Sequence, residues 1–171
     1  FFKNGTARFF GLGNQTREDQ ETNYTDRELL GFITGGLYVG PGRRVTWTER
    51  LRNVEVQVGA VPKIPFTQSV FPAIKGTGGA TVWGHKLAFL DDTRDDTLTP
   101  TVGSYFTMFV ELAQSLTADT NTVFSRYGFD YRILLPNQTK RYTFVFRAKL
   151  DATVGGAEIP FFERSSLGGQ T

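Results

Sequence analysis

Four charged side chains near the middle of the chain are the residues best suited to chemistry by type and spacing. They are Asp92, Arg94, Asp95 and Asp96, in the stretch DTRDDTLTPTVGSYF. Carboxylates beside an arginine can move protons or bind Ca²⁺, but the sequence supplies no partner nucleophile and no EF-hand spacing. A turn over about residues 92–103 accounts for them better, because aspartates accept hydrogen bonds from nearby N–H groups, Pro100 fixes φ, and Gly103 permits the next strand to start. We therefore expect a hydrogen-bonded turn and no enzymatic activity.

The composition excludes several other kinds of site. The chain has 171 residues, no cysteine and one histidine, His85, which excludes disulfides, thiolate zinc sites, a cysteine nucleophile and multi-histidine metal clusters. Its 19 Lys and Arg against 17 Asp and Glu give a formal net charge of +2. The basic residues are also dispersed, which predicts no nucleic-acid partner. Gly11-Leu12-Gly13 is too short for a dinucleotide fingerprint, so we expect no cofactor and no bound metal.

The aromatic and glycine content indicates β structure. The chain contains 16 Phe, 6 Tyr and 19 Gly while being only 39% hydrophobic. Aromatic residues suit a pleated surface, and glycine suits turns and bulges. No window reaches the roughly 18 unbroken apolar residues of a spanning helix. A membrane β-barrel stays open, because its strands alternate and escape hydropathy scans.

Apolar and polar residues alternate along three long segments in the second half of the chain: 104–112, 122–133 and 140–154. In 140–154 the even positions from Tyr142 to Val154 are aromatic or aliphatic, whereas Arg147, Lys149 and Asp151 share the odd face. These predicted strands are longer than the roughly 5 or 6 residues that are usual for a soluble strand.

Four earlier segments complete a prediction of seven strands and no significant helix: 6–12, 28–40, 43–60 and 79–91. In 43–60 the apolar positions change from odd (Val45, Trp47, Leu51) to even (Val54, Val56, Val58). We predict a β-bulge near Arg52–Asn53 to explain that switch.

The connections favour a membrane barrel over a soluble β protein. Long loops at about 13–27 and 61–79 contrast with tight turns at 40–42 and 136–138, a pattern typical of outer-membrane barrels. Soluble β-sandwiches and lipocalin-like barrels share the alternating strands. The strand lengths and the charged second faces, which suit a wet lumen, favour the membrane.

Three stretches resemble the β-barrel domain of the Omp85 superfamily, the BamA/TamA-like or bacterial surface antigen proteins. They are WGHKLAFLD followed by DTRDDTLTPTVGSYF, AEIPFFERSSLGGQT at 157–171, and RFFGLGN at 8–14 followed by ETNYTDRE. The resemblance covers most of the chain in matching order. It implies an antiparallel transmembrane β-barrel of roughly sixteen strands in a bacterial outer membrane. Residues 1–171 would supply about seven of them, as a fragment of a longer chain that carries soluble domains such as POTRA repeats upstream.

The family's role is insertion of outer-membrane proteins or polypeptide translocation. The resemblance thus implies contacts with outer-membrane lipid or lipopolysaccharide, client polypeptides and other assembly proteins. It also makes the acidic turn periplasmic. A passive porin-like or surface-binding barrel, and a soluble β-sandwich binding module, are the alternatives.

The resemblance further implies that about residues 156–171 begin a loop that folds into the lumen. Its candidate residues are Phe161, Phe162, Glu163, Arg164, Gly168 and Gly169. We expect the aromatic rings to pack on the inner wall and Glu163 or Arg164 to pair with lumen charges. The family's Arg-Gly-Phe/Tyr tip has no counterpart before Thr171, so Arg164 does not take its place.

Overall fold

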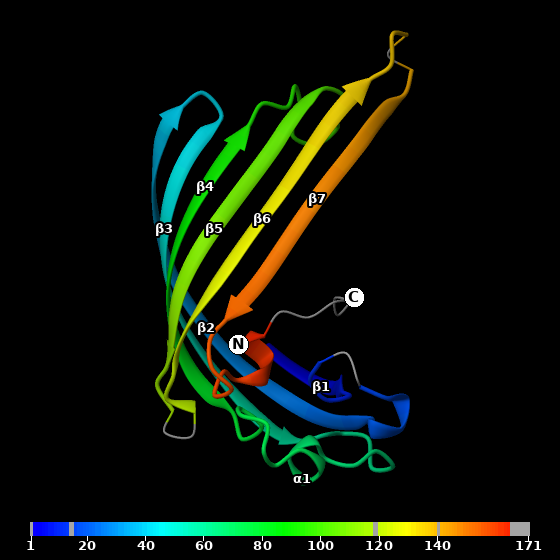
Figure 1. Ribbon diagram of the computed structural model, residues 1–171, viewed down its shortest axis with the longest axis vertical. Helices are drawn as coiled ribbons and strands as arrows, with labels where there is room; N and C mark the ends of the chain where they lie inside the picture. Colours follow the sequence, from blue (N-terminus) through cyan, green and yellow to red (C-terminus); the bar gives the residue numbers. More distant parts are fainter. Residues whose placement is uncertain (1, 14–15, 118–119, 140, 165–171) are drawn as a thin grey trace.

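The computed structural model describes residues 2–13, 16–117, 120–139 and 141–164. Its strands are β1 (Phe2–Phe9), β2 (Thr22–Gly40), β3 (Arg43–Val58), β4 (Ala80–Asp92), β5 (Gly103–Ser115), β6 (Val123–Pro136) and β7 (Thr143–Val154). Each strand pairs antiparallel with the next, and the single sheet curls into half a barrel (Figure 1). The all-β class and the seven antiparallel strands predicted from the sequence are confirmed.

Helical structure is confined to short turns in the residues described. They include α1 (Thr67–Val70) and 3₁₀ turns at Glu18–Gln20 and Phe161–Glu163. None of the described helices has the length and apolar character needed to cross a membrane.

The two ends of the sheet carry different connections. The turn end, uppermost in Figure 1, holds residues 41–42, 93–102, 137–139 and 141–142. The opposite loop end holds residues 10–13, 16–21, 59–79, 116–117 and 120–122 and the segment after β7. We use "turn end" and "loop end" in this sense throughout.

The strand register sorts side chains onto two unlike faces. In each strand the alternate residues that face the convex side are largely apolar and widely exposed, including Ile33 at 79% and Phe146 at 61%. The concave face carries charged residues in register across neighbouring strands, such as Glu111 opposite Arg126. The period of two in the sequence therefore separates an apolar outside from a polar inside.

The predicted bulge at Arg52–Asn53 is wrong. β3 pairs without interruption through both residues with β2 and β4. Register shifts lie instead between Tyr38 and Gly40 and between Asn4 and Ala7. The same alternate residues of β3 face the concave side throughout, but they change from charged to apolar along the strand. Val54 and Val56 share that face with Arg52 and are buried in an apolar cluster at the loop end.

Several predicted boundaries also shift. The expected loop at 13–27 ends at Glu21, because residues 22–27 begin β2, which pairs with β1 from Thr22 and with β3 from Tyr24. The first strand spans Phe2–Phe9 and not 6–12, and β5 continues past 112 to Ser115. The expected loop at 61–79 is present between β3 and β4 and includes α1.

Candidate functional site

The segment after β7 folds back inside the curl of the sheet (Figure 1). We call residues 155–164 the inner segment. Its 3₁₀ turn is closed by the Glu163 N–H, which donates to the Pro160 carbonyl at 3.0 Å. The Phe161 N–H donates to the Lys75 carbonyl at 3.0 Å, which ties the inner segment to the loop before β4. The backbone thus fixes which side chains face the sheet.

Apolar side chains of the inner segment fill two buried clusters on the concave face. Ile159 packs with Val82, Ala113 and Phe124. Phe161 packs with Ala7, Tyr24, Val54 and Val56, and its ring lies 5.0 Å from Phe9 and 5.3 Å from Tyr24, centroid to centroid. Phe162 contacts both clusters. Burial of large aromatic rings stabilises this docked position.

Glu163 is the charged centre of the site. Its side chain is 0% exposed and accepts two hydrogen bonds from Arg50, at 3.0 and 3.1 Å, and one from Arg52 at 3.0 Å. Arg126 lies 3.6 Å away. Arg52 also donates to the Phe162 carbonyl at 3.3 Å. One carboxylate from the inner segment is therefore held by three arginines of the sheet.

Further carboxylates balance these arginines. Arg50 pairs with Glu111 at 2.7 Å, and Arg52 pairs with Glu28 at 3.0 Å. The charge cluster thus consists of Glu28, Arg50, Arg52, Glu111, Arg126 and Glu163. Gly84 leaves room for it, since a Cβ there would overlap a Glu111 carboxylate oxygen. Buried charges are tolerated when they are paired and hydrogen-bonded in this way.

The environment keeps Glu163 ionised. Burial raises the pKa of its carboxyl, but the hydrogen bonds from Arg50 and the charges of Arg50 and Arg52 outweigh burial and lower it below its ordinary value. A carboxylate whose pKa is lowered in this way is ionised at neutral pH. The described residues also contain no group of three or more potential metal ligands. The arrangement is suited to holding a segment in place.

Arg164 does not join the charge cluster. Its guanidinium donates to the carbonyls of Ala157 at 3.0 Å and Ile159 at 3.4 Å, which closes the inner segment on itself. Of the two expected lumen pairings, the structure therefore places only Glu163 against sheet charges. Gly168 and Gly169 lie outside the described residues.

Sequence reasoning missed Glu28, Arg50 and Arg52. The predicted bulge put Val54 and Val56 on the face opposite Arg50, away from the apolar cluster. Positions 50, 52, 54 and 56 are all even, and this shared parity was the signal that could have placed Arg50 and Arg52 on the same face as Val54 and Val56. The contacts of Arg50 and Arg52 with Glu163 join segments that are far apart in the sequence, so the local pattern of residues does not predict them.

The acidic turn uses its carboxylates on its own backbone. Asp95 accepts from the Thr101 and Val102 N–H groups at 2.9 and 3.1 Å and from the Thr101 hydroxyl at 2.6 Å. These bonds lower the pKa of Asp95 to about 2. Asp96 accepts in the same manner from the Leu98 and Thr99 N–H groups on the near side of Pro100.

The ends of this turn are fixed by an ion pair and a glycine. Arg94 pairs with Asp92 at 2.7 Å, where β4 ends. Gly103 has φ +110°, and a Cβ there would overlap the Thr93 carbonyl. The geometry is that of a hydrogen-bonded turn and gives no support to a catalytic group.

A polar group centred on Glu49 lies within the apolar convex face. Glu49 accepts from the Trp47 and Trp83 indole N–H groups at 2.6 and 3.0 Å and lies 2.7 Å from His85 Nδ1. The lone histidine is thus a strand residue held by a neighbouring carboxylate. Its ring lies 4.6 Å from that of Trp83, centroid to centroid.

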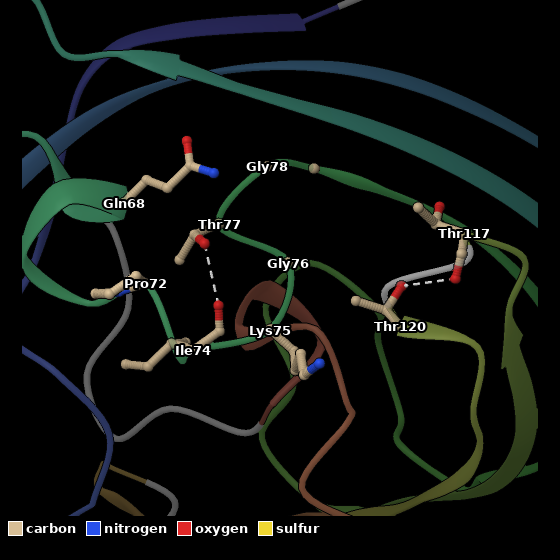
Figure 2. Close-up of a pocket in the computed structure, with 10 residues that line it drawn as sticks. Gln68, Pro72, Ile74, Lys75, Gly76, Thr77, Gly78, Thr117 and Thr120 are labelled. Carbon is tan, nitrogen blue, oxygen red and sulfur yellow. Dashed lines mark hydrogen bonds between the residues drawn. The ribbon is translucent and has the colours of Figure 1, made fainter.

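A hollow of about 280 Å³ lies at the loop end, between the loop before β4 and the connection after β5 (Figure 2). Its hydroxyls bond to nearby carbonyls, Thr77 to Ile74 at 3.1 Å and Thr120 to Thr117 at 3.5 Å. The ammonium of Lys75 pairs with Glu158 at 2.9 Å. Because these hydroxyls and the Lys75 ammonium are already engaged, the hollow is a weaker candidate than the charge cluster.

Comparisons with protein-family models, curated proteins and solved structures find no match to this chain. Membership of the Omp85 superfamily therefore stays a prediction from the sequence.

Proposed function

We propose that this chain forms part of a transmembrane β-barrel in a bacterial outer membrane, with its convex face toward lipid and its concave face toward a water-filled lumen. The 13 residues of β4 extend about 43 Å at about 3.3 Å per residue, and a tilt of about 45° reduces that span to about 30 Å, the thickness of the hydrocarbon core. The exposed apolar convex face and the charged concave face support this orientation.

The soluble sandwich alternative fits less well. A β-sandwich buries the apolar face of each sheet against a second sheet. All seven strands of the described chain lie in one sheet, and the apolar face is the uncovered one. In water, an exposed apolar surface of this extent would be an aggregation hazard.

We infer further that the barrel acts in insertion of outer-membrane proteins or in polypeptide translocation, without chemistry of its own. The observation that carries this proposal is the burial of Glu163 against Arg50 and Arg52, which anchors the inner segment on the lumen wall. The same segment contains residues 161–164, the described part of the FFERSSLGG stretch that resembles the family's lumen loop. Client polypeptides, assembly proteins and outer-membrane lipid or lipopolysaccharide are the partners that follow.

A reconstitution experiment separates this function from that of a passive porin. The full-length protein is placed in lipid vesicles, and the rate at which an unfolded outer-membrane protein inserts is measured. We expect acceleration over empty vesicles, reduced by Glu163→Gln and unchanged by Glu158→Gln. Ion conductance without acceleration would support the porin and contradict the proposal.

A further inference from the structure

Outside the charge cluster, the concave face of β3 to β7, with the start of the turn after β4, carries more positive than negative charge. Its cations are Arg44, Lys86, Arg94, Arg132, Arg147 and Lys149, and its anions are Asp92, Asp130 and Asp151. We call these residues the basic face. The charge cluster at the loop end, in contrast, balances three arginines with three glutamates.

Asp130 shows which anion this surface accommodates. Arg132 and Arg147 each direct Nε and Nη2 at its two oxygens, with the Nη2 distances both 2.7 Å. Two forked guanidinium groups therefore share one carboxylate. Their side chains stay 38% and 49% exposed, so further faces of both groups are open to the concave space. Planar bidentate recognition of carboxylates is the characteristic strength of arginine.

Tyr105 organises the neighbouring cations. The guanidinium carbon of Arg94 lies 4.9 Å from the centre of its ring, and that of Arg132 lies 5.4 Å from it. Cation–π contacts of this kind orient the guanidinium groups without neutralising them. Among the residues that the structure describes, Arg44, Lys86 and Lys149 form no ion pair. The basic face thus combines oriented arginines with cations that form no ion pair among the described residues.

We propose that the basic face binds an extended acidic polypeptide segment through its carboxylates. Arg147 and Lys149 are two residues apart on β7 and point to the same face, so they repeat at about 6.8 Å, the spacing of alternate side chains in an extended peptide. A carboxylate partner is favoured over phosphate because Asp130 already occupies such a fork. The inference rests on the proposed function, in which polypeptides contact the lumen, and it names the charge class of the segment they present.

The test measures binding of fluorescent peptides to the full-length protein in detergent micelles by anisotropy. The probe is a ten-residue peptide of alternating Glu and Ser, compared with the same peptide carrying Gln in place of Glu. We expect the Glu peptide to bind about tenfold tighter at low salt and to lose most of that advantage at about 0.5 M salt. The variant Lys86→Gln with Lys149→Gln should weaken its binding about tenfold.

A matched variant removes two positive charges elsewhere. Arg17→Gln with Lys63→Gln changes exposed residues of the loop-end connections and should leave peptide binding unchanged. Equal binding of the Glu and Gln peptides would overturn the inference, as would equal effects of the two double variants. Tighter binding of inorganic polyphosphate than of the Glu peptide would overturn the choice of carboxylate.

The proposed function is tested separately, in the vesicle insertion assay. A protein that accelerates client insertion but does not discriminate between the two peptides contradicts only the peptide inference. A protein that binds the Glu peptide but leaves client insertion at the rate of empty vesicles contradicts the proposed function.

Discussion

Arg50 donates two hydrogen bonds to Glu163, at 3.0 and 3.1 Å, across 113 positions of sequence. The carboxylate is fully buried, so its desolvation must be offset by well-placed partners. Buried pairs of this kind add little net stability compared with apolar packing, but they are costly to break. Their contribution here is to specify where the inner segment docks on the concave face.

Replacing Glu163 should release the inner segment. Glu163→Gln leaves the buried Arg50 and Arg52 without their shared anion, and we expect local opening of residues 157–164 to become easier by about 3 to 5 kcal/mol. Hydrogen exchange of the Phe161 amide, which donates to Lys75, reports this opening. The exposed pair of Glu158 with Lys75 gives the control, since Glu158→Gln should cost no more than about 1 kcal/mol. Similar protection of the Phe161 amide from hydrogen exchange in both variants would contradict this role of Glu163.

Truncating Phe161 should leave a cavity in the loop-end apolar cluster. Its ring packs among Tyr24, Val54 and Val56, and Phe161→Ala should destabilise that packing by about 3 to 5 kcal/mol. Limited proteolysis in vesicles should then cleave the inner segment faster. Leu98→Ala, in the exposed acidic turn, should leave the rate unchanged. Equal rates for wild type and Phe161→Ala would show that the ring does not anchor the segment.

A methyl group at position 84 should disrupt the charge cluster from the sheet side. In Gly84→Ala the new Cβ would overlap a Glu111 oxygen and lie 3.4 Å from Arg50 Nε, so the Arg50–Glu111 pair must move. We expect faster hydrogen exchange in the inner segment, although residue 84 lies on β4. Gly35→Ala is the control, because nothing lies within 4 Å of its added Cβ. If both alanines behave alike, Gly84 is not needed for the cluster.

The acidic turn should respond to pH only in strong acid. The folded turn lowers the pKa of Asp95 to about 2, below its unfolded value of about 3.9. A lowered pKa means that the carboxylate contributes stability above about pH 4 and loses it as the pH falls toward about 2. A ¹³C titration of the Asp95 carboxyl measures this directly. A midpoint near 4, or an unaltered turn in Asp95→Asn, would contradict these hydrogen bonds.

The features that sequence predicted well are local. Alternation along 122–133 and 140–154 placed Asp130 and Arg147 on one face, because the period of a strand is two whatever lies opposite. The acidic turn was predictable for the same reason: Asp95 bonds to residues six and seven positions away.

The features that sequence did not predict depend on contacts between distant segments. The change of chemistry at Val54 looked like a bulge, because the burial of the concave face at the loop end comes from the inner segment more than 100 positions later. Thr22–Arg27 looked like a loop because most of its residues are polar. They pair with β1 and, from Tyr24 onward, also with β3. The three arginines around Glu163 come from β3 and β6, two strands that are not neighbours in the sheet, so their meeting at Glu163 is not a local feature.

Accessibility of spin labels along β7 in lipid bilayers tests the transmembrane proposal most directly. This chain has no cysteine, so single cysteines introduced in the full-length protein at positions 144 to 149 place one label each within it. We predict that labels at 144, 146 and 148 collide with oxygen dissolved in lipid, whereas labels at 145, 147 and 149 collide with a water-soluble nickel chelate. Equal access of the nickel chelate to all six positions would contradict a convex face in lipid and a concave face in water.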